Sequence, residues 1–494
     1  MLTATDGGFP GPPSARLVDR RRFSDDHAKH DHTFEASRRA AMTAARPAPW
    51  HPSVAPSPRA QWRRARRRMR QRKPWAVPMA LLAAAVLLSW LLPALDRWLD
   101  DASQEVGERL FPLLDTGSMA TLLGAIAGGM ITLTGLVFTA ITLAMQFGAT
   151  QLSVRVVPML QQDAVMRWSM GTFMATFLYS LLIAIRLAVR QQDYRPVLST
   201  IFALGLTILS ACLFFALVTR VALVLNSGAL LRRVGGQGSR AVVRLSPPTG
   251  GARPYGGVRP VRDPEAMEVD LARPPRTGQV LLAWNEPRLR RLAERWGVGL
   301  ELCAYPGDFI ALRSTLFLVH GANDAVKPEQ LLRCLLFAEC YSPEADPAGA
   351  LRTLVDVALK AMSPAINDPA RAVQALDHIE DLLVLLVPVA PPGAGMSGDA
   401  RFCHPVRTWA DYVCVGTDEV RHFAADSMQV LRRLRALFER LAWICSEEQA
   451  EALTVRLAAM DAHAGRHWSQ ALDRRLAGRP DAQGLGSEAG TDLA

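Results

Sequence analysis

The chain has 494 residues, of which half are hydrophobic and 21% are charged, and its formal net charge is +10. So many charged residues exclude a protein that lies wholly within a membrane, and the length allows roughly two or three structural units. Because the apolar residues concentrate between Trp75 and Leu225, the composition indicates a membrane segment joined to a water-exposed domain.

The N-terminal part is rich in Pro, Ala, Arg, Ser and His and has no sustained apolar periodicity. Such a composition predicts a disordered, basic tail over residues 1–74. The tail ends in a basic cluster directly before the first apolar run, where positive charge holds a segment inside the cell and attracts anionic lipid headgroups. No recognisable nucleic-acid module accompanies the cluster, so we expect lipid contacts from Arg66, Arg67, Arg68 and Arg70.

Four apolar runs follow, each near or above the ~20 residues that cross a bilayer. They cover Trp75–Leu95, Ser118–Phe147, Trp168–Val189 and Pro196–Leu225. The basic tail places the N-terminus inside, and an even number of spans returns the remainder of the chain to the same side. The sequence therefore predicts a four-helix transmembrane region over residues 75–226, in a bacterial inner membrane, with both termini cytoplasmic.

The second predicted span has small or hydroxylated residues at intervals of three or four, which places them on one helical face. We call this face the small-residue stripe, and its members are Gly124, Gly128, Thr132, Gly135, Thr139, Thr142 and Gln146. Two interpretations compete: tight helix packing, within a subunit or between the subunits of a homo-oligomer, and a polar wall that lines a pore. Packing is favoured because no charged residue lies in the middle of this span. The third span has a possible partner stripe, formed by Ser169, Thr172, Thr176 and Tyr179.

The rest of the chain predicts a cytoplasmic α+β domain. Paired glycines and prolines predict a linker over 227–277, and short strands around one helix predict a small β-containing unit over 278–321. Apolar residues at three-to-four spacing predict a cytoplasmic helical domain over 322–478, and 479–494 reads as a second disordered tail. The predicted fold class is a mainly α membrane protein with about four transmembrane helices, a small β unit and a helical bundle.

The segment Ser363-Pro-Ala-Ile-Asn-Asp-Pro369 joins two predicted helices. In the structural interpretation Asn367 or Asp368 caps the helix that Pro369 begins, and the neighbouring charges form solvated pairs. In the functional interpretation the segment and the preceding helix present a polar site for a ligand, an ion or a partner. Its candidate residues are Asp356, Ser363, Asn367, Asp368 and Pro369, with Asp356 and Asp368 foremost, and the structural interpretation is favoured.

The stretch LVDVALKAMSPAINDPARAV, the second and third spans and the turn Pro306-Gly-Asp-Phe309 resemble a bacterial family of predicted membrane proteins classed as a domain of unknown function, DUF2254. The similarity spans roughly residues 75 to 460. The resemblance implies the membrane topology and membership of the family, and it brings no known activity.

We expect no catalytic role and no cofactor, because the sequence has no P-loop, GxSxG, HExxH or dinucleotide-binding glycine motif in a suitable context. His463 and His467 share a helix face, but no third ligand lies nearby, so we expect no metal site. Two functions remain: a channel-like or transport-related homo-oligomer, and a non-catalytic membrane-anchored scaffold or regulatory protein that recruits a cytoplasmic partner.

Overall fold

The computed structural model describes residues 62–63, 75–98, 116–151, 163–189, 197–245, 265–271, 279–338, 346–393 and 395–486. The four predicted lipid-contacting arginines lie outside these residues, as do the links between the predicted spans. The predicted disorder of residues 1–74 falls almost entirely outside them as well.

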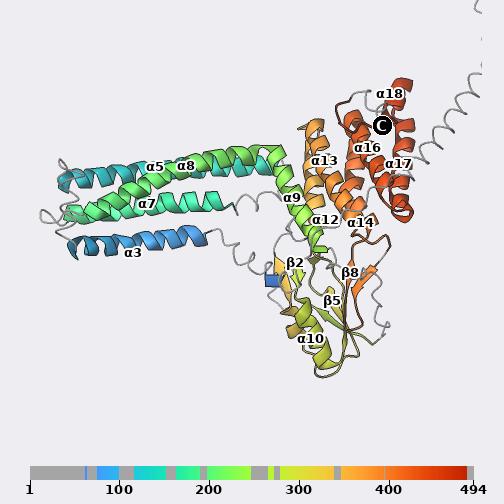
Figure 1. Cartoon of the computed structure of the whole chain (residues 1–494), viewed down its shortest axis with the longest axis horizontal. Helices are drawn as coiled ribbons and strands as arrows, with labels where there is room; N and C mark the ends of the chain where they lie inside the picture. The colour runs from blue at the N-terminus through green and yellow to red at the C-terminus, as the bar shows by residue number, and fades with distance from the viewer. Residues whose placement is uncertain are drawn as a thin grey trace, which may run out of the picture. The chain divides into compact units, whose positions relative to one another are not determined.

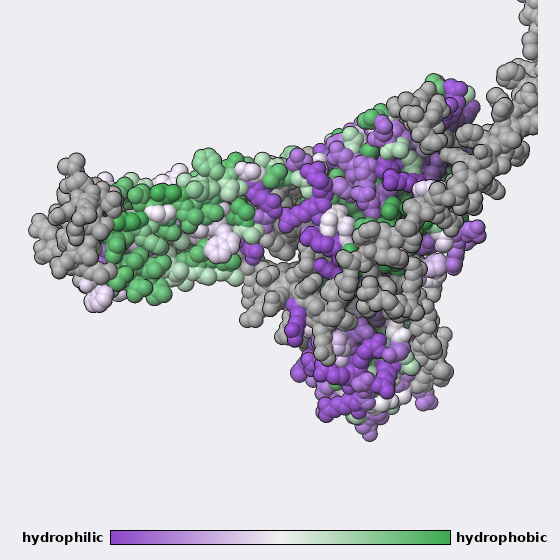
Figure 2. All heavy atoms as spheres, in the orientation of Figure 1, coloured by the Kyte–Doolittle hydropathy of each residue, from purple (hydrophilic) through white to green (hydrophobic). Residues whose placement is uncertain are grey.

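Four described helices are long and apolar enough to cross a membrane, in agreement with the four predicted spans. Each has an apolar stretch of at least 21 residues, where a bilayer requires ~20. Their surface is predominantly hydrophobic in Figure 2, in contrast to the hydrophilic surface of the C-terminal part. These candidate spans are α3 (Ala76–Trp98), α5 (Thr116–Gln151), α7 (Ala164–Val189) and α8 (Val197–Leu225).

Helix α7 is central, because it packs against α3, α5 and α8 (Figure 1). The polar stripe of α7 is buried, and three of its four hydroxyl groups hydrogen-bond across to α8. These bonds join Ser169 to the Leu213 carbonyl at 3.4 Å, Thr176 to Ser210 at 3.1 Å and Tyr179 to the Ser199 carbonyl at 3.1 Å. Interhelical hydrogen bonds of this kind hold helices together where water is excluded. The stripe of the third span therefore serves the α7–α8 contact and does not pair with the small-residue stripe of α5.

Directly after α8 comes another helix, α9 (Ser227–Leu245), where the sequence predicted a linker over 227–277. Strand β1 (Met267–Asp270) also falls in that range and pairs with another strand. The linker prediction is therefore wrong for both segments.

The glycines of α9, taken as loop signals in the sequence, instead allow close packing. Helix α9 packs against α12 (Pro347–Ala361) and α13 (Pro369–Leu386). A Cβ built on Gly238 would lie 2.7 Å from the Cβ of Ala350 and 2.7 Å from a methyl group of Leu382. Real Cβ atoms do not approach so closely, so this contact between the helices requires glycine.

Two sheets follow α9. The five-stranded sheet has the order β1-β5-β3-β8-β7, and the three-stranded sheet has the order β4-β2-β6. Apart from β1, their strands are β2 (Gln279–Trp284), β3 (Gly299–Leu302), β4 (Phe309–Ile310), β5 (Thr315–His320), β6 (Leu335–Ala338), β7 (Gly395–Gly398) and β8 (Phe402–Val406). Helix α10 (Glu286–Trp296) is the one helix that the sequence predicted in this unit, and it contributes Leu289, Leu292 and Trp296 to the core.

The β-containing unit is larger than the predicted 278–321. Strand β8 runs parallel to β3, with Leu300 opposite Phe402, and β7 pairs with β8. Strand β6 lies within the region 322–478 that was predicted to be helical, directly after the short helix α11 (Pro328–Leu332). A short apolar run such as Leu335–Ala338 is compatible with a helix or a strand, and here its pairing with β2 makes it a strand. The region 322–478 is therefore helical only in part.

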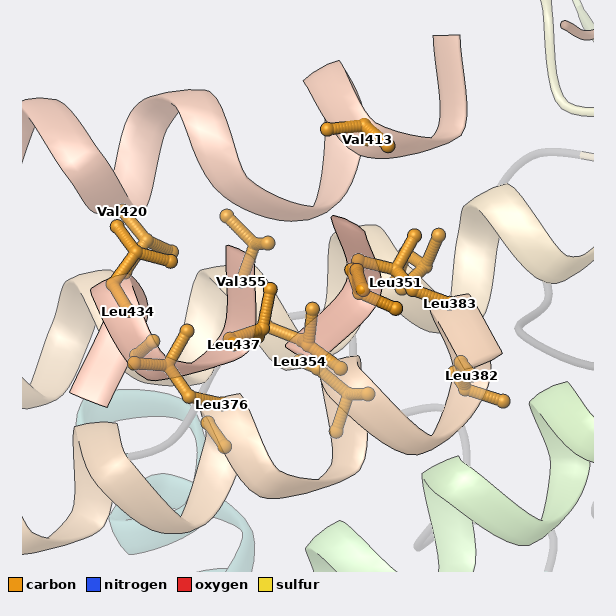
Figure 3. Close-up of a cluster of buried hydrophobic side chains, with 14 of the residues drawn as sticks. Leu351, Leu354, Val355, Leu376, Leu382, Leu383, Val413, Val420, Leu434 and Leu437 are labelled. Carbon is orange, nitrogen blue, oxygen red and sulfur yellow. The ribbon is translucent and has the colours of Figure 1, made fainter. Parts of the chain in front are cut away.

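A bundle of helices forms the largest core of the C-terminal part. Figure 3 shows fully buried leucines and valines from α12, α13, α14, α15 and α16 in contact. Helix α9 contributes Leu231 and Val234 to the same core. Beyond α13 the bundle consists of α14 (Trp409–Val413), the π-helical turn η2 (Cys414–Asp418), α15 (Glu419–Phe423), the turn η3 (Ala424–Asp426), α16 (Met428–Ile444), α17 (Glu447–His467) and α18 (Ala471–Ala477).

The predicted disordered tail 479–494 is wrong for residues 479–486, which pack on α16. The backbone N–H of Asp481 donates to the Arg432 carbonyl at 3.2 Å. The side chain of Gln429 donates to the Gly484 carbonyl. Polar segments dock without apolar periodicity when such hydrogen bonds fix them, which explains why composition alone misled the prediction.

Candidate functional site

The small-residue stripe of α5 faces away from the other candidate spans. Six of its seven members are exposed, and Thr142 is partly exposed. A Cβ built on Gly124, Gly128 or Gly135 would meet no other heavy atom within 4 Å. The opposite face of α5 is buried and carries Met130, Val137 and Ile141. Within the described part of the chain the stripe therefore packs against no helix, which leaves packing between subunits or the lining of a path.

The threonines of the stripe satisfy their own hydroxyl groups. Thr132 donates to the Gly128 carbonyl at 2.9 Å, and Thr139 donates to the Gly135 carbonyl at 3.0 Å. Thr142 does the same with the residue one turn before it, at 2.9 Å. A hydroxyl bonded to its own helix needs no water or partner. The stripe is therefore a surface whose threonine donors are already used.

Two of these donations also link neighbouring members of the stripe, because Gly128 and Gly135 are the acceptors. The glycines leave their carbonyls open to the threonine side chains, and no bulky group covers the backbone. Another helix could approach this backbone closely, which is the geometry that GxxxG-type contacts use. Larger apolar side chains stand beside the stripe, and the exposed ones are Ile131, Leu136, Phe138, Leu143 and Phe147.

The segment 363–369 forms the turn between α12 and α13. The N–H of Asp368 donates to the Ala361 carbonyl at 2.7 Å, which closes the turn. Asn367 has a φ of 47°, a left-handed conformation that Asn adopts more readily than most residues. Asp368 caps α13 by accepting from the Arg371 N–H at 3.0 Å, and Pro369 begins the helix. The local sequence thus has a structural explanation.

Asp356 takes part in an ion-pair network on α12. The Nε of Arg352 donates to Asp356 at 3.0 Å, and a terminal nitrogen of Arg352 donates to Glu419 at 3.0 Å. The hydrogen bond that Arg352 donates to Glu419 raises the pKa of the Arg352 guanidinium above its usual value, and this effect outweighs burial, which lowers the pKa. Asp356 therefore helps to fasten α12 to α15, whereas Asp368 and Asn367 shape the turn that follows.

A buried acid that sequence reasoning missed lies at the start of α7. Asp163 is only 3% exposed and accepts from Arg220 of α8, at 2.9 Å from Nε and 2.8 Å from a terminal nitrogen. Arg233 of α9 lies 3.5 Å from the same oxygen, and the second oxygen accepts from the Val165 N–H at 3.1 Å. One carboxylate thus joins α7, α8 and α9. A single acid beside an apolar run, facing arginines at the end of the last span, is the signal that could have revealed it.

The two histidines considered as metal ligands have other contacts. The rings of His463 and His467 stack with centroids 5.1 Å apart, and His467 pairs with Asp426 at 3.1 Å. No group of three or more metal-ligating side chains occurs among the residues that the structure describes.

The described residues define a mainly helical protein with four candidate membrane spans and a folded C-terminal part that contains strands. Residues 71–440 match the family of predicted membrane proteins called DUF2254, and the chain belongs to this family. An uncharacterized protein of Mycobacterium bovis is 24% identical over 375 residues, which cover 73% of this chain and 71% of that protein. An uncharacterized protein of Mycobacterium tuberculosis has the same identity and coverage. No solved structure matches the chain.

Proposed function

We propose that the protein is a channel-like or transport-related homo-oligomer of the bacterial inner membrane, in which α5 of each subunit faces α5 of its neighbours. The observation that carries the proposal is the outward-facing small-residue stripe. A helix surface meant only for lipid has no need of glycines at Gly124, Gly128 and Gly135, whereas a helix–helix contact gains from them. Most homo-oligomers have closed symmetry, and a closed ring built on this face would bring the α5 helices to its central axis.

The chemistry of the stripe defines the kind of path that such a ring would enclose. The stripe has no ionisable side chain, and its threonine hydroxyls are bonded to their own helix. A path lined in this way cannot select ions by charge. We therefore expect a weakly selective path whose narrow apolar part, near Leu136 and Leu143, closes by losing its water.

Helix α5 and α9 give the C-terminal part a mechanical connection to the path. Helix α5 has 36 residues and so is about 54 Å long, well beyond a hydrocarbon core of about 30 Å. Near its end, Met145 packs against the core of the helical bundle. Helix α9 belongs to the same core and is tied to α7 and α8 through Asp163. Movement in the bundle would thus act directly on the candidate spans.

The orientation of the protein belongs to the same proposal. Arginines gather where the last span ends and along α9, at Arg220, Arg232, Arg233 and Arg240. Positive charge next to a span favours the cytoplasmic side. We place the C-terminal part, and with it the N-terminal tail, in the cytoplasm.

Flux measurements on purified protein in liposomes test the proposal. Gly128→Leu and Gly135→Leu would fill the stripe without any clash inside the subunit, and we expect both to abolish ion flux. Gly205→Leu is a matched control, because Gly205 of α8 also has nothing within 4 Å of a Cβ, and it should leave flux unchanged. Mass measurement in detergent should show the same oligomer for the wild-type protein and for Gly205→Leu. Flux that survives at both stripe positions, or a monomeric wild-type protein, would contradict the proposal.

A scaffold or regulatory protein is the second candidate function. It is favoured by two large apolar side chains on the turn around β4, Phe309 and Leu312, which are 65% and 53% exposed. Exposed apolar side chains of this size are typical of surfaces that bind another protein. An assembled protein that conducts nothing under ionic or osmotic gradients would favour this function over the first.

A further inference from the structure

We infer that one face of α9 binds the anionic headgroups of membrane phospholipids. The helix covers Ser227–Leu245 and contains four arginines and no Asp or Glu. These arginines are Arg232, Arg233, Arg240 and Arg244, and we call the face that carries them the arginine face. It is separate from the basic N-terminal tail, and the inference does not depend on the proposed transport function.

The arginine face lies opposite the face that α9 buries in the helical bundle. With 3.6 residues per turn, Arg233, Arg240 and Arg244 lie within about 40° of one another around the helix axis. Arg232 lies about 80° from Arg240. The opposite face belongs to the bundle core and carries Leu231, Val234 and Val242. The bundle therefore covers the apolar face of α9, and the arginine face points away from the bundle.

The contact of Arg233 places the arginine face at the end of the candidate spans. Its guanidinium lies 3.5 Å from Asp163, which directly precedes the apolar stretch of α7 that begins at Ala164. The other partner of this acid, Arg220, lies in the last turn of the apolar stretch of α8. Charged groups at the ends of spans lie at the headgroup level, because the hydrocarbon core excludes them. The arginine face therefore begins at that level.

The two exposed arginines of this face also extend toward the start of α9, where it follows α8. A Cβ built on Gly228 would lie 3.5 Å from a terminal nitrogen of Arg232, so this guanidinium lies beside the first turn of the helix. The Nε of Arg240 donates to the Gly236 carbonyl at 2.9 Å, which directs its side chain back by one turn. Among the residues that the structure describes, no carboxylate pairs with Arg232 or Arg240.

Both guanidinium groups are close enough to the membrane to be attracted by it, whatever the tilt of α9. From Gly228 to Gly236 the helix rises by about 12 Å. The headgroup layer is about 5–8 Å thick on each side of the hydrocarbon core. Charges interact over a further 8–10 Å, approximately, at physiological ionic strength. Even if α9 pointed straight away from the membrane, its arginines would stay within this distance.

Anionic phospholipid fits this surface better than a soluble polyanion does. The surface adjoins the end of the spans, so lipid headgroups lie beside it whenever the protein is in a membrane. A guanidinium donates paired hydrogen bonds to a phosphate group, as it does to a carboxylate. Each arginine near an anionic membrane surface strengthens the attraction about fivefold. Two exposed arginines should therefore contribute a factor of about 25.

Native mass spectrometry tests the inference on the full chain, released from an uncharged detergent after incubation with equal amounts of phosphatidylglycerol and phosphatidylcholine. We expect the wild type to retain phosphatidylglycerol preferentially. Arg232→Gln combined with Arg240→Gln should remove at least one bound phosphatidylglycerol per chain and weaken that site at least tenfold. Replacing both by Lys keeps the charge and should preserve most of the binding. Unfolding temperatures close to the wild type would show that these variants fold.

A matched control removes the same charge elsewhere. Arg466 and Arg475 are exposed on α17 and α18, and replacing both by Gln should leave lipid binding unchanged. An equal loss in this control would overturn the inference, because net charge alone would then attract the lipid. Equal retention of the two lipids by the wild type, or full retention of phosphatidylglycerol by Arg232→Gln with Arg240→Gln, would overturn it as well. So would binding of an RNA oligonucleotide that needs these two arginines while phosphatidylglycerol does not.

Discussion

The carboxylate of Asp163 offers a direct test of how the candidate spans are joined to α9. Replacing it by Asn keeps an oxygen that can accept from the Val165 N–H, now at 3.1 Å. The change replaces the other oxygen, which faces the guanidinium groups of Arg220 and Arg233, by an NH₂ group that cannot accept. Asp163→Ala removes both functions. The pair of variants therefore separates the ionic contact from the helix cap.

The expected magnitudes follow from distance and exposure. Hydrogen bonds to charged groups contribute about 1.5–3 kcal/mol. The side chains of Arg220 and Arg233 are 36% and 35% exposed, so water partly replaces the lost contact and the low end applies. We expect Asp163→Asn to lower the free energy of unfolding by about 1.5 kcal/mol. Asp163→Ala should cost about 1 kcal/mol more through loss of the cap.

The two arginines should differ in their effects. Arg220 lies 2.8 Å from the carboxylate and Arg233 lies 3.5 Å from it, so Arg220→Met should destabilise more than Arg233→Met. Unfolding in mixed detergent micelles, followed by circular dichroism, gives the free energies. A value for Asp163→Asn within about 0.5 kcal/mol of the wild type, the range of an ordinary surface substitution, would refute this reasoning. The opposite order of the two arginine variants would refute it as well.

Three further predictions concern the C-terminal part. Glu380→Gln should lower the free energy of unfolding by about 3 kcal/mol, because Glu380 and Arg433 are only 5% and 6% exposed. Replacing both residues by Leu should recover most of this loss in denaturant unfolding. If the double variant loses as much stability as Glu380→Gln, a buried ion pair is contradicted. Burial lowers the pKa of His404, so folding favours the neutral form of its imidazole. The free energy of unfolding should therefore be highest above about pH 6.5 and should fall below that pH by at most about 1.4 kcal/mol per pH unit. His404→Gln should flatten this pH profile. Gly238→Ala should lower the free energy of unfolding by about 1–3 kcal/mol, because the added methyl group overlaps its neighbours. Gly236→Ala has open space around the added methyl group and should stabilise α9 by up to about 1 kcal/mol. Thermal unfolding compares the two variants.

The sequence was sufficient for features whose causes are local. Length and apolar composition alone define a candidate span, so all four were found within a few residues. The turn before α13 could be predicted because its cap at Asp368 and the proline at Pro369 are adjacent in the chain. Capping needs no information from distant residues.

Features that depend on distant contacts could not be found in this way. Gly238 is indistinguishable from a loop glycine until α12 and α13 lie against it. Strand β6 is a short apolar run until β2 pairs with it. Periodicity likewise identified the small-residue stripe as one face of a helix, but it contains no information on which face the other spans cover. Asp163 was missed for the same reason, since its partners lie on other helices.

The parallel pairing of β3 with β8 has a consequence for how the domain is made. The chain forms α11, α12 and α13 between these two strands. The central strand β3 is therefore synthesised long before its parallel neighbour β8. Until then β3 is a bare edge, and the closure of so long a loop is slow. A fragment ending at His320 should therefore aggregate, because the nascent sheet can only mature once the helical segment has left the ribosome. The β-containing unit is thus completed by residues that follow α12 and α13 in the chain, and a cut between β3 and β8 leaves its five-stranded sheet incomplete.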